Sequence, residues 1–420
     1  MLATLLFPIP FWGLEQILSD PKLDGATVSA YVCELDGDKV FEKNSALHVI
    51  PGSNQKLLSN AFALHTLGPD YTPVTRIWKE SKRTLVATTG DPLLTYQQLV
   101  DARAKLKLDR KLPVYVKEPF APGIPDSWEF DDLPNKYAAP VTGFTVDKGS
   151  FELWHKGGRI VGVPYNYGVQ IYASKSPAPL SIAYDPMRRM VTVDGNWPEK
   201  DARLDTLSIW RPDREAAFLL GSGFIRSTQT PSATPNLTIT GKPLSDMMVA
   251  CLQPSDNNIA EQLLLLASLR LGELPKKPYP AARERLTNFM EKVVGVEKAD
   301  VRPFDGSGMS RHSYVTTRAL GRLLKWSNDQ STAPFWRSAL ASPGKGTLAN
   351  RLKETTFQGK TGTLDMVSAL SGYVRHKSGQ ELIVSVILNQ YACTPAEARD
   401  ILDSFVKQAA DLDLTAMDGD

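Results

Sequence analysis

Three short motifs that could transfer an acyl group occur in one order along the 420-residue chain. They are Ser53-Asn54-Gln55-Lys56, Ser255-Asp256-Asn257 and Lys360-Thr361-Gly362. This set is typical of enzymes in which a serine attacks a carbonyl carbon and a lysine moves the proton. A chain of this size should contain roughly one or two Ser-x-x-Lys matches by chance, so the ordered set, and not one motif, predicts a serine acyl-transferase.

The chain contains more than one candidate for the nucleophile, because four Ser-x-x-Lys matches begin at Ser19, Ser53, Ser342 and Ser404. A lysine three residues after a serine reaches it when both lie on one helix face. Ser53 follows the breaker pair Pro51-Gly52 and precedes an apolar helical pattern that ends at Gly68. Proline interrupts the matches at Ser19 and Ser342, and no chemical motif follows Ser404. We therefore predict that Ser53 is the nucleophile and opens a helix.

The other two motifs are predicted to lie on different kinds of element. Ser255-Asp256-Asn257 stands in a polar break between two apolar helical patterns. Lys360-Thr361-Gly362 precedes the segments Ser371–Arg375 and Glu381–Leu388, which are predicted strands joined by a turn. The lysine motif is therefore predicted to lie on a strand.

The residue types suggest how a proton would move. A serine hydroxyl needs a base, and none of the five histidines has a supporting context. A lysine serves as a base only when burial or a second cation destabilises its ammonium form, and Lys56 and Lys360 would form such a pair. We assign Lys56 as the base for acylation, and Ser255 as the hydroxyl that passes a proton to the leaving amine.

The remaining motif residues suit contacts with a substrate. The amide of Asn257 would hold both the substrate amide and the base. Lys360 and Thr361 suit a free carboxylate, and Gly362 lets the strand backbone approach closely. The backbone N–H groups of Ser53 and Thr363 are expected to bind the oxyanion.

From about Ala30 to Ala410, the chain resembles the penicillin-binding D-alanyl-D-alanine carboxypeptidases of the low-molecular-mass class C, or penicillin-binding protein 4 type, which form peptidase family S13. Besides the three motifs, four uncommon strings carry this resemblance: Gly90–Leu94, Trp128–Leu133, Tyr137–Pro140 and Asp305–Arg311. The chain is somewhat short for the family.

The resemblance implies a substrate, an intermediate and an inhibitor class. The substrate would be a peptidoglycan stem peptide, cleaved at D-Ala-D-Ala or at a cross-link through an acyl-enzyme on Ser53. A β-lactam would acylate the same serine and hydrolyse slowly. Asp132 and Tyr137 would line the pocket for the diamino acid side chain, with Arg311 near its carboxylate. No cofactor and no metal are implied.

The chain length and the long gap between the first two motifs predict two or three domains. Residues 71–231 are rich in proline and in short β patterns, and we interpret them as one or two inserted β-rich domains. Residues 1–70 and 232–420 would form the catalytic domain, an α/β (α+β) unit whose antiparallel sheet is flanked by helices. The resemblance implies that this is the penicilloyl-serine transferase fold.

The charge and cysteine content narrow the possible partners and the redox chemistry. A net charge of +2 with interspersed signs argues against a nucleic-acid partner. Cys33, Cys251 and Cys393 cannot form a complete disulfide framework, and their most economical interpretation is as small core residues.

The family resemblance implies export to the periplasm or another extracytoplasmic location. Leu2–Trp12 is apolar, but no basic residue precedes it, and Pro8 and Pro10 interrupt it. Three explanations stay open: a truncated start, a signal outside this chain, or a remnant that packs on the core. No run of eighteen apolar residues occurs, so no membrane-spanning helix is predicted.

Two alternative functions are compatible with parts of the sequence. A serine β-lactamase needs a carboxylate that activates water, and the segment Glu284–Asn288 lies between the second and third motifs, although its spacing departs from the usual Glu-x-x-Leu-Asn. A β-lactam or wall-peptide sensor would be acylated without turnover. The sequence does not decide between carboxypeptidase and endopeptidase preference, and it determines neither the diamino acid nor the oligomeric state.

Overall fold

The computed structural model describes residues 12–414, which divide into two compact units. The first unit contains the described residues up to Pro69, then Met248–Asp256, and then the described residues from Pro280 onward. The second unit contains Asp70–Met247 and Asn257–Tyr279. Residues 1–11, which hold most of the apolar stretch considered for export, lie outside the described residues.

The first unit is built around an antiparallel sheet with the strand order β16-β17-β18-β1-β2. Its strands are β1 (Thr27–Glu34), β2 (Lys39–Lys43), β16 (Gln358–Leu364), β17 (Val367–Arg375) and β18 (Glu381–Asn389), with a small pair β14 (Val301–Arg302) and β15 (Tyr314–Val315). Its helical elements are α1 (Trp12–Leu18), η2 (Pro21–Leu23), η3 (Gly52–Asn54), α2 (Gln55–Leu67), η7 (Lys298–Asp300), α8 (Thr317–Asn328), α9 (Ala333–Ala339), η8 (Gly346–Leu348) and α10 (Pro395–Ala410). Two helices cross the boundary between the units along the chain, α5 (Leu244–Leu252) and α7 (Tyr279–Lys292).

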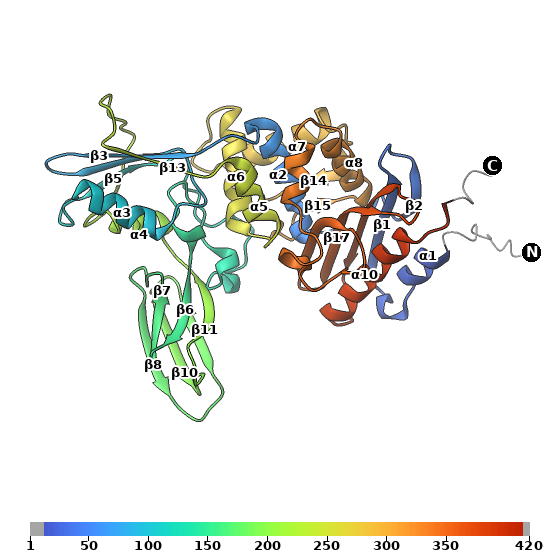
Figure 1. The fold of residues 1–420 in the computed structure, drawn as a ribbon, viewed down its shortest axis with the longest axis horizontal. Helices are drawn as coiled ribbons and strands as arrows, with labels where there is room; N and C mark the ends of the chain where they lie inside the picture. Colours follow the sequence, from blue (N-terminus) through green and yellow to red (C-terminus); the bar gives the residue numbers. More distant parts are fainter. Residues whose placement is uncertain (1–11, 415–420) are drawn as a thin grey trace, which may run out of the picture. The chain divides into compact units, whose positions relative to one another are not determined.

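Alternating side chains on β17 and β18 explain why helices cover both faces of this sheet. Leu370, Val384 and Val386 belong to a core cluster with residues of α1 and α10. On the other face, the Tyr373 hydroxyl donates to the Leu324 carbonyl of α8, at 2.6 Å. Figure 1 shows α1 and α10 side by side next to the sheet. The predicted antiparallel sheet flanked by helices is therefore confirmed.

The predicted helix after Ser53 is also confirmed. A 3₁₀ turn, η3, leads directly into α2, and the helix ends before Gly68, whose φ is +79°. The residues from Gln55 to Leu64 are all buried, which holds the first turn of α2 rigidly. The segments at Ser19 and Ser342 are turns, as predicted, and Ser404 lies in α10.

The second unit contains a mixed sheet with the strand order β12-β5-β4-β3-β13 and two smaller sheets, β11-β6-β7 and β8-β10-β9. The strands are β3 (Val74–Lys79), β4 (Thr84–Thr88), β5 (Val114–Lys117), β6 (Ser150–Lys156), β7 (Arg159–Val163), β8 (Gln170–Lys175), β9 (Ser181–Asp185), β10 (Met190–Gly195), β11 (Ala202–Ser208), β12 (Phe224–Arg226) and β13 (Leu237–Thr240). The helical elements are α3 (Tyr96–Leu106), η4 (Phe130–Asp132), η5 (Lys136–Ala138), η6 (Asp147–Gly149), α4 (Pro212–Phe218) and α6 (Asn257–Arg270).

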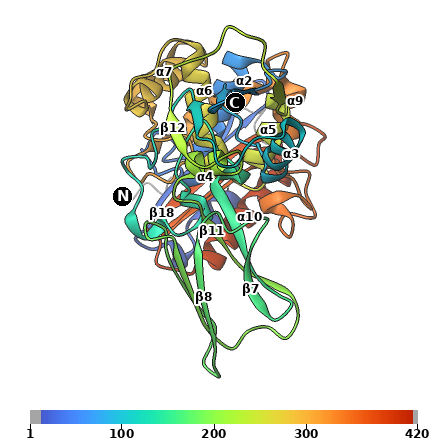
Figure 2. The same cartoon turned by 90° about the vertical axis from the view of Figure 1, so that its left-hand side faces the viewer.

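One hydrophobic core joins the sheets of the second unit. The cluster includes Val86 and Val114 of the mixed sheet, Leu153 of β6 and Val191 of β10. Figure 2 shows β7, β8 and β11 as an arm of neighbouring strands. The β-rich character predicted for residues 71–231 agrees with these strands, although α3 and α4 add helices to the region.

The compact units and the predicted domains divide the chain at different places. The domains 1–70 with 232–420, and 71–231, stay a prediction. In the division into compact units, residues 232–247 and 257–279 belong with the second unit, because β13 pairs with β3 and α6 packs on η5 and η6.

The structure also shows the state of the three cysteines and whether the described helices could span a membrane. Cys33, Cys251 and Cys393 are free thiols, and the first two are buried. Cys393 is only partly buried, so the interpretation as a core residue fits it less well. Within residues 12–414, no helix has the length and the apolar character needed to cross a bilayer.

Candidate active site

The predicted nucleophile and the predicted base are in direct contact. Ser53 lies in η3 and Lys56 in the first turn of α2, so they share one helical face. The Lys56 Nζ donates to Ser53 Oγ at 2.9 Å, and it also donates to the backbone carbonyl of Ser307 at 2.8 Å. The lysine side chain is fully buried. Neutral oxygens thus aim the amine at the serine hydroxyl.

The second lysine is in contact with the serine of the second motif. Lys360 on β16 is fully buried, and its Nζ donates to Ser255 Oγ and to the Thr361 carbonyl, both at 2.8 Å. Burial, and then the charge of Lys56, hold the pKa of Lys360 well below its usual range. The two lysines are therefore close enough to influence each other, and Lys360 loses its proton more readily than a solvated lysine.

The backbone at Ser255 has a conformation that non-glycine residues seldom adopt. Its φ is +64°, in the turn that follows α5. The Asp256 N–H donates to the Cys251 carbonyl at 2.8 Å, and the Cys251 thiol donates to the Asp256 carbonyl at 3.6 Å. The Asn60 amide on α2 in turn donates to Cys251 Sγ at 3.4 Å. These bonds connect the nucleophile helix to the turn that aims Ser255.

Strand β16 runs very close to the turn that carries Ser53. A Cβ atom at Gly362 would lie 2.7 Å from the Pro51 carbonyl oxygen and 3.2 Å from the Ser53 nitrogen. A Cβ atom at Gly52 would lie 3.3 Å from the Thr363 nitrogen. Glycines at both positions permit the approach, which places the backbone around the Ser53 and Thr363 amides side by side.

The sequence prediction missed the loop that holds Lys56. The Asp305 carboxylate is fully buried and accepts from the backbone N–H groups of Gly308 and Ser310, both at 2.8 Å. This folds the loop so that consecutive carbonyls face α2. Those of residues 305, 306 and 307 accept from Gln55, Ser59 and Lys56, respectively. The string Asp305–Arg311 carries part of the family resemblance, but the sequence predicts a role only for its Arg311. The carboxylate before a glycine-rich turn is the signal that could have revealed the role of Asp305.

A chain of buried hydroxyl groups also supports the turn that carries the nucleophile. It was not predicted from the sequence. The Asn54 amide donates to Ser371 Oγ of β17 at 2.8 Å, and Ser371 Oγ is 2.9 Å from Ser385 Oγ of β18. No motif marks these serines, because only the register of β17 and β18 brings them together.

Three predicted site residues form a second cluster, in the second unit. The Asn257 amide, in the first turn of α6, donates to the Tyr137 carbonyl at 2.8 Å. The Tyr137 hydroxyl donates to the Asp132 carboxylate at 2.9 Å. Partial burial, and then the Asp132 carboxylate, raise the pKa of Tyr137 to about 12, so the phenol stays protonated as a donor.

The remaining predicted residues lie at the exposed end of β16 or beside it. Arg311 is exposed and donates to the Asp365 carbonyl at 3.0 Å. Thr361 Oγ1 donates to Thr347 Oγ1 at 2.8 Å, and Thr363 is exposed. Glu284, which a β-lactamase would need as a water-activating group, is an exposed residue of α7.

The structure thus brings the predicted residues together in two groups. The first unit holds Ser53, Lys56, Ser255, Lys360, Thr361, Gly362, Thr363 and Arg311, and the second holds Asn257, Asp132 and Tyr137. In the described part of the chain, no group of three or more histidine, cysteine or carboxylate side chains is arranged to hold a metal ion. The chemistry that the first group supports is nucleophilic acyl transfer through a serine and two lysines.

Comparison with known proteins identifies the same family over nearly the whole chain. A D-alanyl-D-alanine carboxypeptidase of Actinomadura sp. is 26% identical, over 90% of this chain and 80% of its own length. In fold, the chain is similar to penicillin-binding protein 4 of Haemophilus influenzae, with a TM-score of 0.74 and 20% identity over 94% of this chain and 97% of that one. It is also similar in fold to a predatory peptidoglycan endopeptidase of Bdellovibrio bacteriovorus, with a TM-score of 0.52 and 12% identity over 91% and 93% of the two chains. Residues 12–412 match the sequence profile of the D-Ala-D-Ala carboxypeptidase 3 (S13) family, and the chain therefore belongs to this family of serine-type peptidases.

Proposed function

We propose that Ser53 is the nucleophile of a D-Ala-D-Ala carboxypeptidase that acts on peptidoglycan stem peptides. The observation that carries the proposal is the 2.9 Å contact between the buried Lys56 Nζ and Ser53 Oγ, on a turn that β16 approaches closely. A serine whose oxygen touches a buried amine has the base that it needs.

The reaction has two balanced steps. In acylation, Ser53 Oγ attacks the carbonyl of the penultimate D-alanine while Lys56 accepts the hydroxyl proton, and the C–N bond to the terminal D-alanine breaks. The leaving amine takes a proton through Ser255, whose Oγ accepts a hydrogen bond from Lys360. In deacylation, water attacks the ester carbonyl and gives a proton to Lys56, the bond between the acyl carbon and Ser53 Oγ breaks, and Lys56 returns the proton to Ser53 Oγ. The shortened peptide leaves with a new terminal carboxylate.

The groups around these residues would stabilise and orient the substrate. The backbone N–H groups of Ser53 and Thr363 would bind the oxyanion, which the close approach of Gly52 and Gly362 supports. Lys360 is buried and donates to Ser255, so we assign it to proton transfer through that serine. Thr361 and its neighbours on β16 would then contact the substrate carboxylate.

The second unit would contribute to substrate recognition. Asn257 would contact the substrate amide and the base, and its own amide is oriented by the Tyr137 carbonyl. Asp132 and Tyr137 would line the pocket for the diamino acid, with Arg311 near its carboxylate. β-Lactams would acylate Ser53, and the protein would act outside the cytoplasm. The same acyl-enzyme would serve for cross-link cleavage.

The test follows covalent labelling and product release in parallel. The protein is incubated with a fluorescent penicillin and, separately, with a D-Ala-D-Ala stem peptide. Stable labelling together with release of D-alanine supports the proposal. Label lost within seconds would indicate a β-lactamase, and stable label without peptide cleavage would indicate a sensor.

A matched pair of variants identifies the nucleophile. Ser53→Ala should lose both labelling and D-alanine release while its circular dichroism stays unchanged. Ser404→Ala, at an exposed Ser-x-x-Lys serine of α10, should keep both activities. Labelling retained in Ser53→Ala would place the nucleophile elsewhere.

A further inference from the structure

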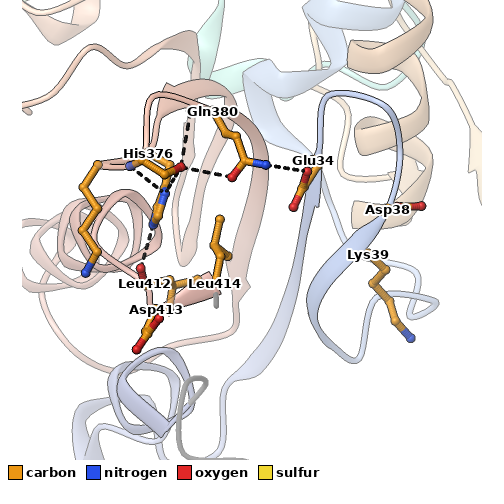
Figure 3. A pocket seen from close by; sticks show the side chains of 10 residues that line it. Glu34, Asp38, Lys39, His376, Gln380, Leu412, Asp413 and Leu414 are labelled. Atoms are coloured by element: carbon orange, nitrogen blue, oxygen red, sulfur yellow. Dashed lines mark hydrogen bonds between the residues drawn. The ribbon is translucent and has the colours of Figure 1, made fainter. Parts of the chain in front are cut away.

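Two cavities outside the motif residues differ in how their charges are satisfied. One, of about 730 Å³, lies in the first unit between the β1–β2 and β17–β18 turns and the segment after α10 (Figure 3). Its charges are of both signs, and several have partners: Glu34 accepts from Gln380, Lys39 pairs with Glu42, and the His376 ring contacts the Leu412 carbonyl. This cavity favours no ligand of one charge.

The other cavity, of about 490 Å³, lies in the second unit and is strongly positive. Four arginines line it, Arg103, Arg110, Arg189 and Arg214, with Glu215 as the one carboxylate among its lining residues. They come from α3, from the loop after it, from the turn before β10 and from α4. Segments that are distant in the sequence therefore place a net of three positive charges around one space.

Contacts within the protein use only part of the hydrogen-bonding capacity of these four arginines. Arg189 pairs with the buried Glu215 at 2.9 Å, and Arg103 donates to the Leu219 carbonyl at 2.8 Å. Among residues 12–414, the guanidinium groups of Arg110 and Arg214 make no hydrogen bond and no ion pair within 4 Å, although the charge of Arg214 acts on the Glu215 carboxylate. Arg214 lies 5.1 Å from the ring centre of Phe218. Each guanidinium carries five N–H donors, so most donors around the cavity are available.

We propose that this cavity is a binding site for a phosphate group. Like charges around one space repel one another, and a multivalent anion relieves the repulsion. A free phosphate ion or a phosphate monoester carries up to two negative charges, which match a net charge of three better than the single charge of a carboxylate. A phosphodiester group carries one charge, so a polymer would match the cavity only through successive groups. The planar arginine forks are suited to phosphate oxygens. The phosphate can come from a free ion or from a phosphodiester polymer.

The test measures binding of inorganic phosphate by calorimetry, with sodium chloride at the same ionic strength as a reference. We expect saturable binding of phosphate, much weaker binding of acetate, and none of chloride. A short poly(glycerol phosphate) separates the two sources. Binding at least tenfold tighter than that of phosphate would indicate a polymer, and equal binding would indicate the free ion.

Variants assign the binding to the cavity. The double variant Arg110→Ala/Arg214→Ala should weaken phosphate binding about tenfold or more, which corresponds to about 1.4 kcal/mol. Arg189 is kept, because it pairs with a buried carboxylate. The control is Arg188→Ala, which removes an exposed arginine paired with Asp185 beside the cavity and should bind phosphate normally.

Circular dichroism and the thermal midpoint without phosphate establish that each variant is folded. Unchanged phosphate affinity in a folded double variant would overturn the proposal. An equal loss of affinity in Arg188→Ala, or equal heats with chloride, would also overturn it, because binding would then reflect general surface charge.

Discussion

Two groups of buried charged residues, one in each compact unit, differ in the partners they have. In the first, Lys56 and Lys360 are fully buried and donate to hydroxyl and carbonyl oxygens, which carry no net charge. In the second, the buried carboxylates of Asp213 and Glu118 lie beside arginines. Both groups of buried residues lie in a low-dielectric interior, but the lysines have neutral oxygens as partners and the carboxylates have arginines.

This difference separates a reactive site from a structural one. Arg226 bridges the two carboxylates, with N–O distances of 2.9 Å to Asp213 and 3.1 Å to Glu118. Each of these buried carboxylates has an opposite charge beside it, and removing one partner of such a pair would leave a buried charge without compensation. Burial, and then the charge of Lys56, drive Lys360 toward its neutral form, which can accept a proton. We infer that the two buried lysines of the first unit serve chemistry, whereas the arginine-paired carboxylates Asp213 and Glu118 of the second unit serve packing.

The largest expected effect tests the chemical role of the first unit. Lys56→Met should slow acylation by a fluorescent penicillin about 10³-fold, because the hydroxyl loses its base. Stopped-flow or gel labelling measures the rate. The matched control is Lys407→Met on α10, which removes the exposed lysine of another helical Ser-x-x-Lys match and should acylate at the normal rate. Comparable rates in the two variants would contradict the assignment of Lys56.

The next effect concerns stability in the second unit. Burial, and then the charge of Asp213, raise the pKa of Glu118 from 4.5 to about 7. The folded state then binds more protons than the unfolded state between these values, so stability is full below pH 4.5 and falls as the pH rises through 7. The fall should amount to about 3 kcal/mol at most. Urea unfolding followed between pH 4.5 and 8 measures it.

Two variants of the second unit test whether Glu118 causes this fall in stability. Glu118→Gln should flatten the fall in the free energy of unfolding, and the exposed Glu199→Gln should keep it. An unchanged slope in Glu118→Gln would show that other groups cause it.

A smaller effect is expected from the loop that holds Lys56. Asp305→Asn replaces a carboxylate that accepts from two backbone N–H groups, so the loop should shift and the Ser307 carbonyl should leave the amine. We expect a 10- to 100-fold lower acylation rate, equal to about 1.4–2.7 kcal/mol, with little change in the dissociation constant of the penicillin before acylation. Ser307→Ala keeps the carbonyl and should change the rate less than about threefold. If the acylation rate and the affinity for the penicillin both fall, Asp305 has only a general role in folding.

The last prediction concerns how the free energy of unfolding of the first unit changes with pH. The pKa of Lys360 lies well below 10.5 in the folded state, so the unfolded state binds more protons up to that pH and stability rises as the pH increases. The rise for one proton cannot exceed about 1.4 kcal/mol per pH unit. Lys360→Met should remove this rise in urea unfolding between pH 7 and 10, whereas the exposed Lys345→Met should keep it. A falling slope in the unmodified protein would contradict the burial argument.

Much of the fold followed from local patterns. The helix after Ser53, the strand with Lys360 and the hairpin of β17 and β18 were predicted, because each has a clear apolar period and a breaker at its end. The extent of the second unit was not predicted. Its residues 257–279 are separated from the rest by a segment of the first unit, and only long-range packing of α6 assigns them.

The sequence by itself determined the motif residues, their order and the family, since residue types and spacing are sufficient for these. Only the tertiary structure decided how the residues are held. The carbonyl of Ser307 that aims Lys56, the contact of Lys360 with Ser255, and the arginines around one cavity each join segments tens to hundreds of residues apart. Such contacts depend on which backbone groups the packing of distant elements brings within hydrogen-bond distance, and no local pattern records that.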